Sequence, residues 1–173
     1  MKEILDVIIS RRSIRQYKSD MVTEEEINKV IKAGMYAPTG KNKQSPIILA
    51  ITNKEVRDGL SKEIAKLRDV DIDPFYGAPV VLVVLASKDV PTYVYDGSCV
   101  MENMLLEAHA LGLGACWIHH AKQVFENEFG KNLLKSLGIE GEYEGVGHCI
   151  LGYVASNNDN EIPRKDNYVY YIK

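Results

Sequence analysis

The order of apolar segments in this 173-residue chain predicts an α+β fold in which a mixed sheet is sandwiched between helices. Segments typical of strands are interspersed with segments of helical periodicity, and some helical segments follow one another without an intervening strand. The run from Val80 to Ala86 consists almost entirely of valine and leucine, which is typical of a strand buried on both faces. No internal repeat or linker interrupts the chain, so we expect a single domain over residues 1–173.

The N-terminal part of the chain is predicted to form two helices and a loop. Residues Lys2 to Ser10 place their apolar side chains on one helical face, which indicates a short helix docked on the rest of the protein. Thr23 and Glu26 have the spacing of a capping box, which predicts the start of a helix that ends before Pro38. The segment Ala37 to Pro46 is rich in turn formers and side-chain amides and is expected to be a loop.

The remaining elements alternate between strands and helices. We expect, in chain order, a strand at Ile47 to Thr52, a helix at Lys54 to Arg68, an irregular segment at Asp69 to Pro79, the buried strand at Val80 to Ala86, a helix at Asp96 to Leu111, a strand at Ala115 to Ile118, a helix at Gln123 to Leu137, and strands at Gly145 to Tyr153 and Tyr168 to Ile172. Gly112 stands where a helix C-cap glycine belongs.

Composition excludes several classes of protein. A net charge of −3 and a pI near 5.8 argue against a general nucleic-acid binder, which is normally basic. No apolar run approaches the length of a membrane span, and the segment Ile4 to Ile9 is too short for a signal-peptide core. The three cysteines, Cys99, Cys116 and Cys149, show no close pairing pattern, which favours a reducing, cytoplasmic location.

An arginine cluster, Arg11-Arg12-Ser13-Ile14-Arg15, is the most distinctive feature of this mildly acidic chain. Adjacent guanidinium groups repel one another, and their planar forks pair bidentately with phosphate. The cluster therefore indicates a site for a small phosphorylated ligand. The alternative is a basic patch that complements the negative end of the preceding helix.

The amide-rich loop offers groups that suit a flat polar ring. Asn42 and Gln44 can donate and accept at the edge of a heterocycle, and Pro38, Thr39 and Gly40 offer a compact surface for it. The alternative is a connector whose amides face water.

A second basic pair, Arg164-Lys165, lies near the C-terminus. Together with the arginine cluster and the loop, it predicts a ligand with a phosphate at one end and a flat ring system at the other.

Two glycine-containing segments resemble nucleotide-binding motifs but do not match them. The run Gly112-Leu113-Gly114-Ala115-Cys116-Trp117 has tryptophan at the third glycine position and leads from a helix into a strand, the reverse of a Rossmann turn. Gly40-Lys41 is followed by asparagine instead of serine or threonine, so it is no P-loop.

A metal site is not supported either. Cys116, His119, His120, His148 and Cys149 are candidate ligands, but His148 and Cys149 are neighbours on a predicted strand and should point to opposite faces. A cysteine nucleophile is equally unsupported, since nothing marks a thiol of lowered pKa.

Four blocks of the sequence together resemble the FMN-dependent nitroreductase family, and their order and spacing match over nearly the whole chain. They are Arg11 to Tyr17, then Ala37-Pro38-Thr39-Gly40 with Asn42 and Gln44, then Gly112 to Ile118, and finally Gly152-Tyr153 with Arg164-Lys165.

The resemblance implies a three-layer α/β/α sandwich with a mixed, mainly antiparallel sheet, and an intertwined homodimer with two FMN sites at the subunit interface. By motif match, the FMN phosphate and ribityl chain would be held by Arg11, Arg12, Ser13 and Arg15, with Arg164 and Lys165 closing the phosphate pocket. The flavin ring would be lined from the second subunit by Pro38, Thr39, Gly40 and Asn42, with Gln44 in the same loop, and its N5 and O4 edge by Ile118 and His119. The family often has glycine where this chain has His119.

The activity implied is that of a flavoprotein oxidoreductase. NAD(P)H would reduce the flavin and leave, and a nitroaromatic, quinone or similar acceptor would take its place in a ping-pong cycle. No side-chain acid or base is obligatory, although His119 or His120 could donate a proton. The short stretch from Asp69 to Val94 lacks a long helical excursion, which predicts an open pocket.

Two alternatives remain at this point. The first is a non-catalytic FMN-binding protein that stores or senses the cofactor. The second is a domain that binds another phosphorylated ligand through the arginines.

Overall fold

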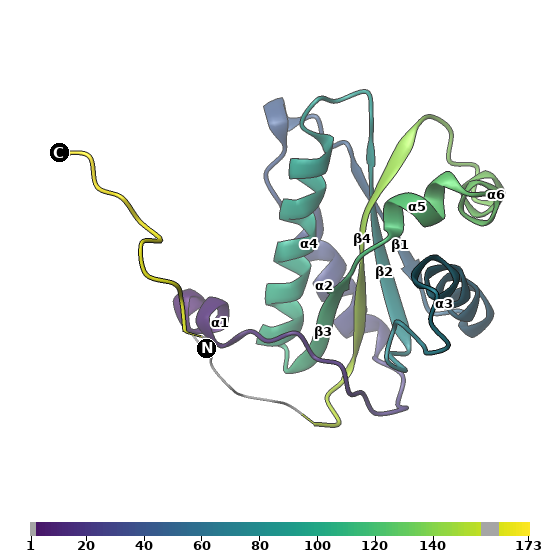
Figure 1. Cartoon of the computed structure of the whole chain (residues 1–173), viewed down its shortest axis with the longest axis horizontal. Helices are drawn as coiled ribbons and strands as arrows, with labels where there is room; N and C mark the ends of the chain where they lie inside the picture. Colours follow the sequence, from purple (N-terminus) through teal and green to yellow (C-terminus); the bar gives the residue numbers. More distant parts are fainter. Residues whose placement is uncertain (1–2, 157–162) are drawn as a thin grey trace.

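The computed structural model describes residues 3–156 and 163–173, and its centre is a twisted sheet with helices on both faces (Figure 1). The strands are β1 (Pro46–Ile51), β2 (Val80–Ser87), β3 (Leu113–Ile118) and β4 (Tyr143–Tyr153). They pair antiparallel in the order β1-β2-β4-β3, so β2 and β4 are central and β1 and β3 form the edges. A parallel bridge between Ser13 and Ala115 adds the stretch after the first helix to the β3 edge.

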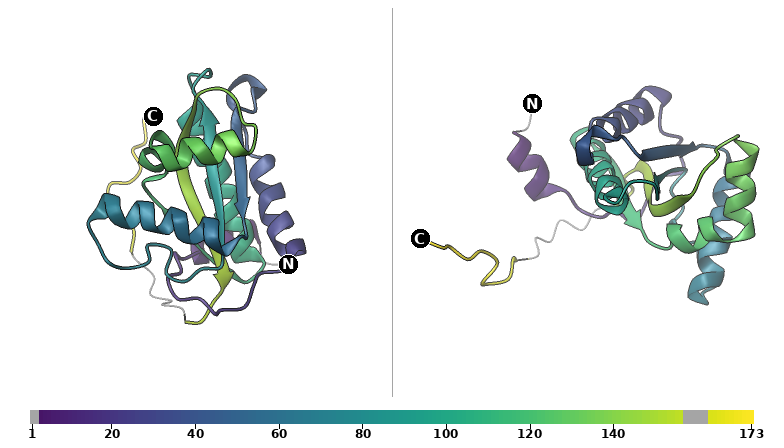
Figure 2. Two further views of the ribbon diagram at one scale, coloured as in Figure 1. Left: turned by 90° about the vertical axis from the view of Figure 1, so that its right-hand side faces the viewer. Right: turned by 90° about the horizontal axis from the view of Figure 1, so that it is seen from above.

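Helices form the two outer layers. They are α1 (Ile4–Ser10), α2 (Glu24–Met35), α3 (Lys54–Arg68), α4 (Tyr93–Ala110), α5 (Ala121–Glu126) and α6 (Glu128–Ser136), with a short 3₁₀ turn at Gly40–Asn42. The helices α2 and α4 cover one face of the sheet, and α3, α5 and α6 cover the other (Figures 1 and 2). The expected three-layer architecture is therefore confirmed. Within the described residues, none of these helices combines the length and the apolarity needed to cross a membrane.

Side-chain caps fix where the helices begin. The capping box at α2 is confirmed: the Glu26 backbone N–H donates to Thr23 Oγ1 at 3.3 Å, and the Thr23 N–H donates to the Glu26 carboxylate at 3.1 Å. Asn53 caps α3 by accepting from the Val56 N–H at 3.0 Å. Such caps satisfy backbone donors that have no partner inside the helix.

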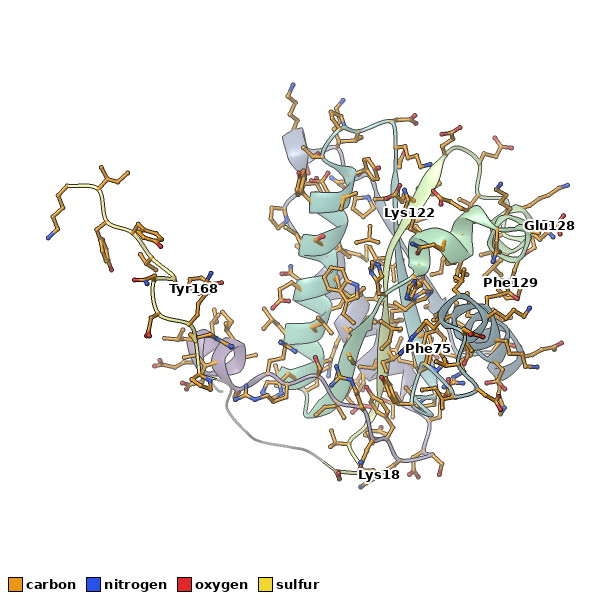
Figure 3. The ribbon with its side chains drawn as sticks, in the orientation of Figure 1. Lys18, Phe75, Lys122, Glu128, Phe129 and Tyr168 are labelled. Carbon is orange, nitrogen blue, oxygen red and sulfur yellow. The ribbon has the colours of Figure 1, made fainter. Side chains whose placement is uncertain are left out.

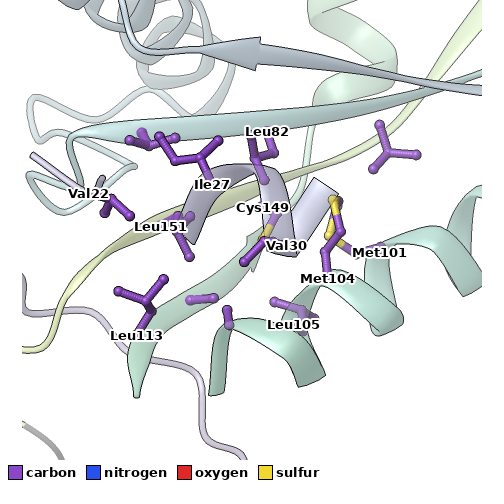
Figure 4. Packing of buried hydrophobic residues seen from close by; sticks show 14 of the residues in the cluster. Val22, Ile27, Val30, Leu82, Met101, Met104, Leu105, Leu113, Cys149 and Leu151 are labelled. Carbon is purple, nitrogen blue, oxygen red and sulfur yellow. The ribbon is translucent and has the colours of Figure 1, made fainter. Parts of the chain in front are cut away.

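Alternation along the strands divides the core into two clusters. On β2, Leu82 (Figure 4) and Val84 pack with α2 and α4. Val81 and Val83 point to the other face and pack with α3, α5 and α6. Each fully buried side chain of this size contributes about 1.5–3 kcal/mol, so these two clusters hold the layers together.

The structure differs from the sequence-based expectation at two elements in the C-terminal half of the chain. The helix predicted over Gln123 to Leu137 is two helices, because Asn127 adopts an extended conformation and caps α6 through the Gly130 N–H at 3.1 Å. The prediction of a strand at Tyr168 to Ile172 is wrong: in the single chain these residues form no strand. Those residues are exposed and extend away from the body, as Figure 3 shows at Tyr168, with no sheet edge beside them to pair with. Lys2, the predicted first residue of α1, lies outside the described residues.

The connection from α3 to α4 contains β2 but no further helix, as expected from its length. Its irregular part is pinned to α3, since the Asp73 carboxylate accepts from Ser61 Oγ at 2.6 Å and from the Gly77 N–H at 2.7 Å. Arg57 also pairs with Asp73. These contacts hold the pKa of Asp73 below its usual value despite partial burial, which opposes the shift.

Candidate functional site

The arginine cluster lies along the open edge of β3. The Ile14 N–H donates to the Ala115 carbonyl at 3.0 Å, next to the bridge between Ser13 and Ala115. A Cβ on Gly114 would lie only 2.8 Å from Ile14 Cγ2, so glycine permits this close approach. The Tyr17 hydroxyl donates to the Ile14 carbonyl at 2.6 Å, which fixes the turn, and burial raises the pKa of Tyr17.

Arg12 performs part of the role that the alternative interpretation assigned to the cluster. Its Nη1 donates to the carbonyls of Ile9 at 2.7 Å and of Arg11 at 2.9 Å, so it caps the C-terminal end of α1. Its Nε is buried and makes no hydrogen bond to any of the described residues. Leaving such a donor unpaired costs about 1–3 kcal/mol, a cost that an anionic ligand beside the cluster would remove.

The other two arginines are placed differently. The Arg15 guanidinium lies 6.0 Å from the centre of the Tyr76 ring, so the loop after α3 borders the cluster. Arg15 is exposed and Arg11 is half-buried. Both remain accessible to a ligand from solvent.

The amide-rich loop is held in a strained backbone conformation. Lys41, Asn42 and Gln44 all have positive φ, at 51°, 53° and 49°. Asparagine tolerates this region, but lysine and glutamine cost about 1–3 kcal/mol each there and persist only where their surroundings determine them. The Gln44 N–H donates to Thr39 Oγ1 at 3.1 Å, and Gln44 Nε2 donates to Asn42 Oδ1 at 3.1 Å. Both amides are exposed to solvent, as the alternative interpretation of the loop expects, and this hydrogen bond orders them relative to one another.

Asp96, which the sequence did not point to, anchors this loop to α4. Its Oδ1 accepts from the Gly40 N–H at 2.9 Å, and its Oδ2 accepts from Thr92 Oγ1 at 3.0 Å. A Cβ on Gly40 would lie 2.3 Å from Thr92 Oγ1, so glycine is required for this contact. In the sequence Asp96 is an ordinary acidic residue in the first turn of a helix. Its partner lies 56 residues away, so no local pattern marks it.

A cavity of about 320 Å³ lies beside the loop, between α2, the start of α4 and β1. Thr39 and Gln44 line it together with the apolar residues Ile31, Met35, Ala37, Pro46, Ile48 and Val100. A mainly apolar cavity with a few polar groups is the kind that takes flat organic molecules.

The two predicted halves of the ligand site lie at opposite ends of α4. The loop contacts Thr92 and Asp96 at its N-terminal end, whereas Ser10, next to the arginine cluster, hydrogen-bonds His109 at 2.8 Å at its C-terminal end. An 18-residue helix is about 27 Å long. One chain by itself therefore does not bring the arginines and the loop together.

At the end of β3, two histidines stand where the flavin edge was predicted. We call His119 and His120 the histidine pair; their ring centres are 4.9 Å apart. His120 has a φ of 70° and precedes α5. Ile118, just before the pair, is buried.

Beneath this strand end lies His148, which is fully buried. Its Nδ1 lies 3.3 Å from the Ile118 carbonyl, which can only accept, so Nδ1 carries the proton. The ring packs against Phe75 and Phe125 at centre distances of 5.4 and 6.5 Å. Burial lowers the pKa of His148 to about 4. Cys149, its neighbour, lies in the opposite cluster, as predicted. In the part of the chain that the structure describes, no set of three metal-ligating side chains comes together.

The buried histidine predicts how stability depends on pH. Its pKa is about 4 in the folded protein and 6.5 when unperturbed, so below pH 6.5 the unfolded chain binds a proton that the folded chain does not. The free energy of unfolding should fall by about 2 kcal/mol from this group between pH 7.5 and pH 5. Urea unfolding at both pH values should show that His148→Gln, which keeps a donor for Ile118 but does not titrate, loses that much less than the parent. Equal losses would contradict the assignment.

Arg164 and Lys165 lie on the C-terminal segment that leaves the body of the molecule (Figure 1). Lys165 Nζ is 5.6 Å from the centre of the Tyr168 ring. That this pair closes a phosphate pocket stays a prediction.

Two sequence comparisons identify the same family of proteins. The model of the nitroreductase family matches residues 8–153. A protein of Archaeoglobus fulgidus, provisionally named NADH dehydrogenase/NAD(P)H nitroreductase, is 32% identical over 164 residues, which cover 92% of this chain and 90% of that protein.

Solved structures similar to this chain are nitroreductases as well. A crystal structure of a nitroreductase with bound FMN from Bacteroides fragilis has a TM-score of 0.90 and 27% identity, with full coverage of both chains. A nitroreductase with bound FMN from Desulfitobacterium hafniense has a TM-score of 0.87 at 24% identity over 99% of this chain and 100% of that one, which shows a shared fold.

Proposed function

The chain belongs to the nitroreductase family, and on that premise we propose that it is an FMN-dependent oxidoreductase that uses NAD(P)H to reduce quinones, nitroaromatics or similar acceptors. Its relative's name points to NAD(P)H as the reductant, and the FMN-bound structures point to the cofactor. When bound, FMN supplies the hydride chemistry, accepting at N5 from the nicotinamide and passing on to the acceptor.

The observation that carries the proposal is the arginine cluster on the edge of β3, with the buried, unpartnered Nε of Arg12 inside it. A phosphate fits this donor set, because guanidinium groups bind it with charge-assisted hydrogen bonds. We assign Arg11, Arg12, Ser13 and Arg15 to the phosphate and ribityl chain, with Arg164 and Lys165 approaching from the C-terminal segment.

The distance along β3 suits the length of the cofactor. From Ala115, where the cluster docks, to His119 is about 13 Å of extended chain, a length that a ribityl chain and part of the ring can span. Ile118 and His119 would then lie at the N5 and O4 edge of the flavin. Their role is to present backbone groups that orient the ring and stabilise charge on it.

Two chains would be needed to complete each site. Because the loop and the arginines of one chain lie at opposite ends of α4, Pro38, Thr39, Gly40, Asn42 and Gln44 would come from a second copy. The exposed apolar face of α1 and the exposed residues Tyr168 to Ile172 support a homodimer, since monomers rarely expose so many large apolar side chains together. The edge of β1 is open for pairing as well.

A composite site of this kind supports ping-pong turnover. The reductant and the acceptor would use the same space over one ring in turn, and the connection from α3 to α4 contributes no helix that could cover it. The described cysteines are all free thiols, which is compatible with work in the cytoplasm.

The visible spectrum tests the proposed function. Purified protein reconstituted with FMN should show the flavin absorbance and bleach on anaerobic addition of NADPH or NADH, with the colour returning when a quinone is added. Bound flavin that never bleaches would indicate a non-catalytic FMN-binding protein. Failure to take up flavin would show that the arginines serve another phosphorylated ligand.

A further inference from the structure

The proposed flavin site uses only backbone groups at the end of β3, so the two imidazole side chains of the histidine pair have no role in it. The first member of the pair, His119, is exposed, and His120 is partly buried behind it. Histidine is the residue type whose charge changes near neutral pH, and it is the commonest proton donor and acceptor in enzymes.

The pair is held in place from below and behind. His148 donates to the Ile118 carbonyl at 3.3 Å and so fixes the last peptide of β3. His120 takes up a left-handed conformation, at φ 70°, immediately before α5. A Cβ on Gly145 would lie 2.4 Å from the Ala121 backbone, so α5 starts in close contact with β4. These contacts fix the backbone from which both imidazoles project.

Burial and the neighbouring charges favour the neutral form of the inner imidazole, His120. Burial, His119 and Arg68 all lower the pKa of His120, in that order of size. Arg68 at the end of α3 is the charged neighbour that acts on His120. The buried His148 on β4, on which both imidazoles of the pair act, is itself neutral near pH 7. His119 is the exposed ring of the pair and the one that an acceptor from solvent can reach, with His120 partly buried beside it.

We propose that the histidine pair is the proton source for the acceptor half-reaction, with His119 as the donor and His120 as the partner that reloads it, and that it fits the site to quinone-type acceptors. This inference rests on the proposed function, because it needs the flavin edge to lie at Ile118 and His119.

The step balances without a further reactant. The quinone takes hydride, two electrons and one proton, from the reduced flavin N5 and becomes a hydroquinone monoanion. The imidazolium of His119 gives its N–H proton to the anionic oxygen, which completes the hydroquinone and leaves a neutral imidazole. A solvent proton then restores the pair through His120.

Comparing a quinone with ferricyanide as electron acceptor separates proton donation by the histidine pair from a purely structural role. Ferricyanide takes single electrons and no proton, so it reports electron delivery by the flavin alone. The test uses FMN-loaded parent protein, His119→Gln, His120→Asn and the double variant, since asparagine tolerates the left-handed backbone at position 120. We expect the double variant to reduce 1,4-benzoquinone about 100-fold more slowly. Reduction of ferricyanide by the same variant should fall at least about tenfold less than reduction of the quinone, because ferricyanide needs no proton.

A readout independent of turnover uses oxidised, FMN-loaded protein labelled with ¹⁵N-histidine. Adding hydroquinone, the product, should shift the imidazole resonances of His119 and His120 and leave that of His109 on α4 unchanged.

The outcomes distinguish the inference from its premise. Quinone reduction that is unaffected in the double variant, or that falls by the same factor as ferricyanide reduction, would overturn the inference while leaving the oxidoreductase intact. Hydroquinone that leaves the imidazole resonances of the pair unmoved would do the same. A parent protein that takes up no FMN would instead refute the proposed function.

Discussion

Alanine at Arg11 or Arg15 is expected to strip FMN from the protein while leaving its fold intact. Each charge-assisted hydrogen bond to phosphate is worth about 1.5–3 kcal/mol, so either change should raise the Kd for FMN by roughly 10- to 150-fold. The side chain of Arg15 is exposed and that of Arg11 half-buried, so little packing is lost. Fluorescence titration of FMN gives the Kd, and urea unfolding of the flavin-free protein gives the stability.

Lys66→Ala is the matched control for this prediction. Lys66 lies on α3, is largely exposed and pairs with Glu63 at 2.6 Å, so its loss removes one positive charge away from the cluster. Its Kd for FMN should equal that of the parent. If both arginine variants kept the parent Kd, the cluster would be no more than a basic patch at the end of α1.

The second large effect is expected from the exposed face of α1. Leu5→Glu combined with Ile8→Glu should convert a dimer into a monomer and abolish FMN binding at the same time. Both side chains are exposed in the single chain, at 62% and 47%, and burying each one at an interface would contribute about 1.5–3 kcal/mol. Light scattering with absorbance detection measures mass and bound flavin together.

The control here introduces the same charges on another surface. Leu67 and Ile72 are similarly exposed, at 46% and 56%, and lie at and beyond the end of α3. Leu67→Glu with Ile72→Glu should leave both mass and flavin content unchanged. A monomeric α1 variant that still bound one FMN per chain would show that the site is complete within one subunit.

Most of the fold could be predicted because its signals are local. The apolar run at Val80 to Ala86 matches β2 almost residue for residue, and the helix predicted at Lys54 to Arg68 has those bounds as α3. The capping box at Thr23 and Glu26 set the start of α2. Each depends on residues a few positions apart, which a single sequence displays.

The two elements that were predicted wrongly depend on interactions that the local sequence pattern does not show. Tyr168 to Ile172 has the composition of a strand, but a strand exists only beside a partner edge, and one chain offers it none in its position away from the body. The break at Asn127 depends on a cap bond that competes with continuing a periodic apolar pattern.

In the candidate site, too, local sequence signals were predictive and contacts between distant residues were not. The residue types of the arginine cluster and the loop pointed to a phosphorylated ring compound, but their separation by the length of α4 could not be foreseen from residue types. Asp96 and the positioning role of His148 were missed because each acts on backbone that is distant in sequence, at Gly40 and Ile118.

The shared site is the central claim, and mixing two defective chains tests it most directly. One chain carries Arg11→Ala with Arg15→Ala, and the other carries Asn42→Ala with Gln44→Ala; two different affinity tags allow the mixed dimer to be isolated after co-expression. Neither variant should hold FMN as a homodimer. The mixed dimer should bind one FMN per two chains, because one of its sites draws intact arginines from one subunit and an intact loop from the other. A mixed dimer that binds no flavin, while the parent binds two, would contradict a site built from two subunits.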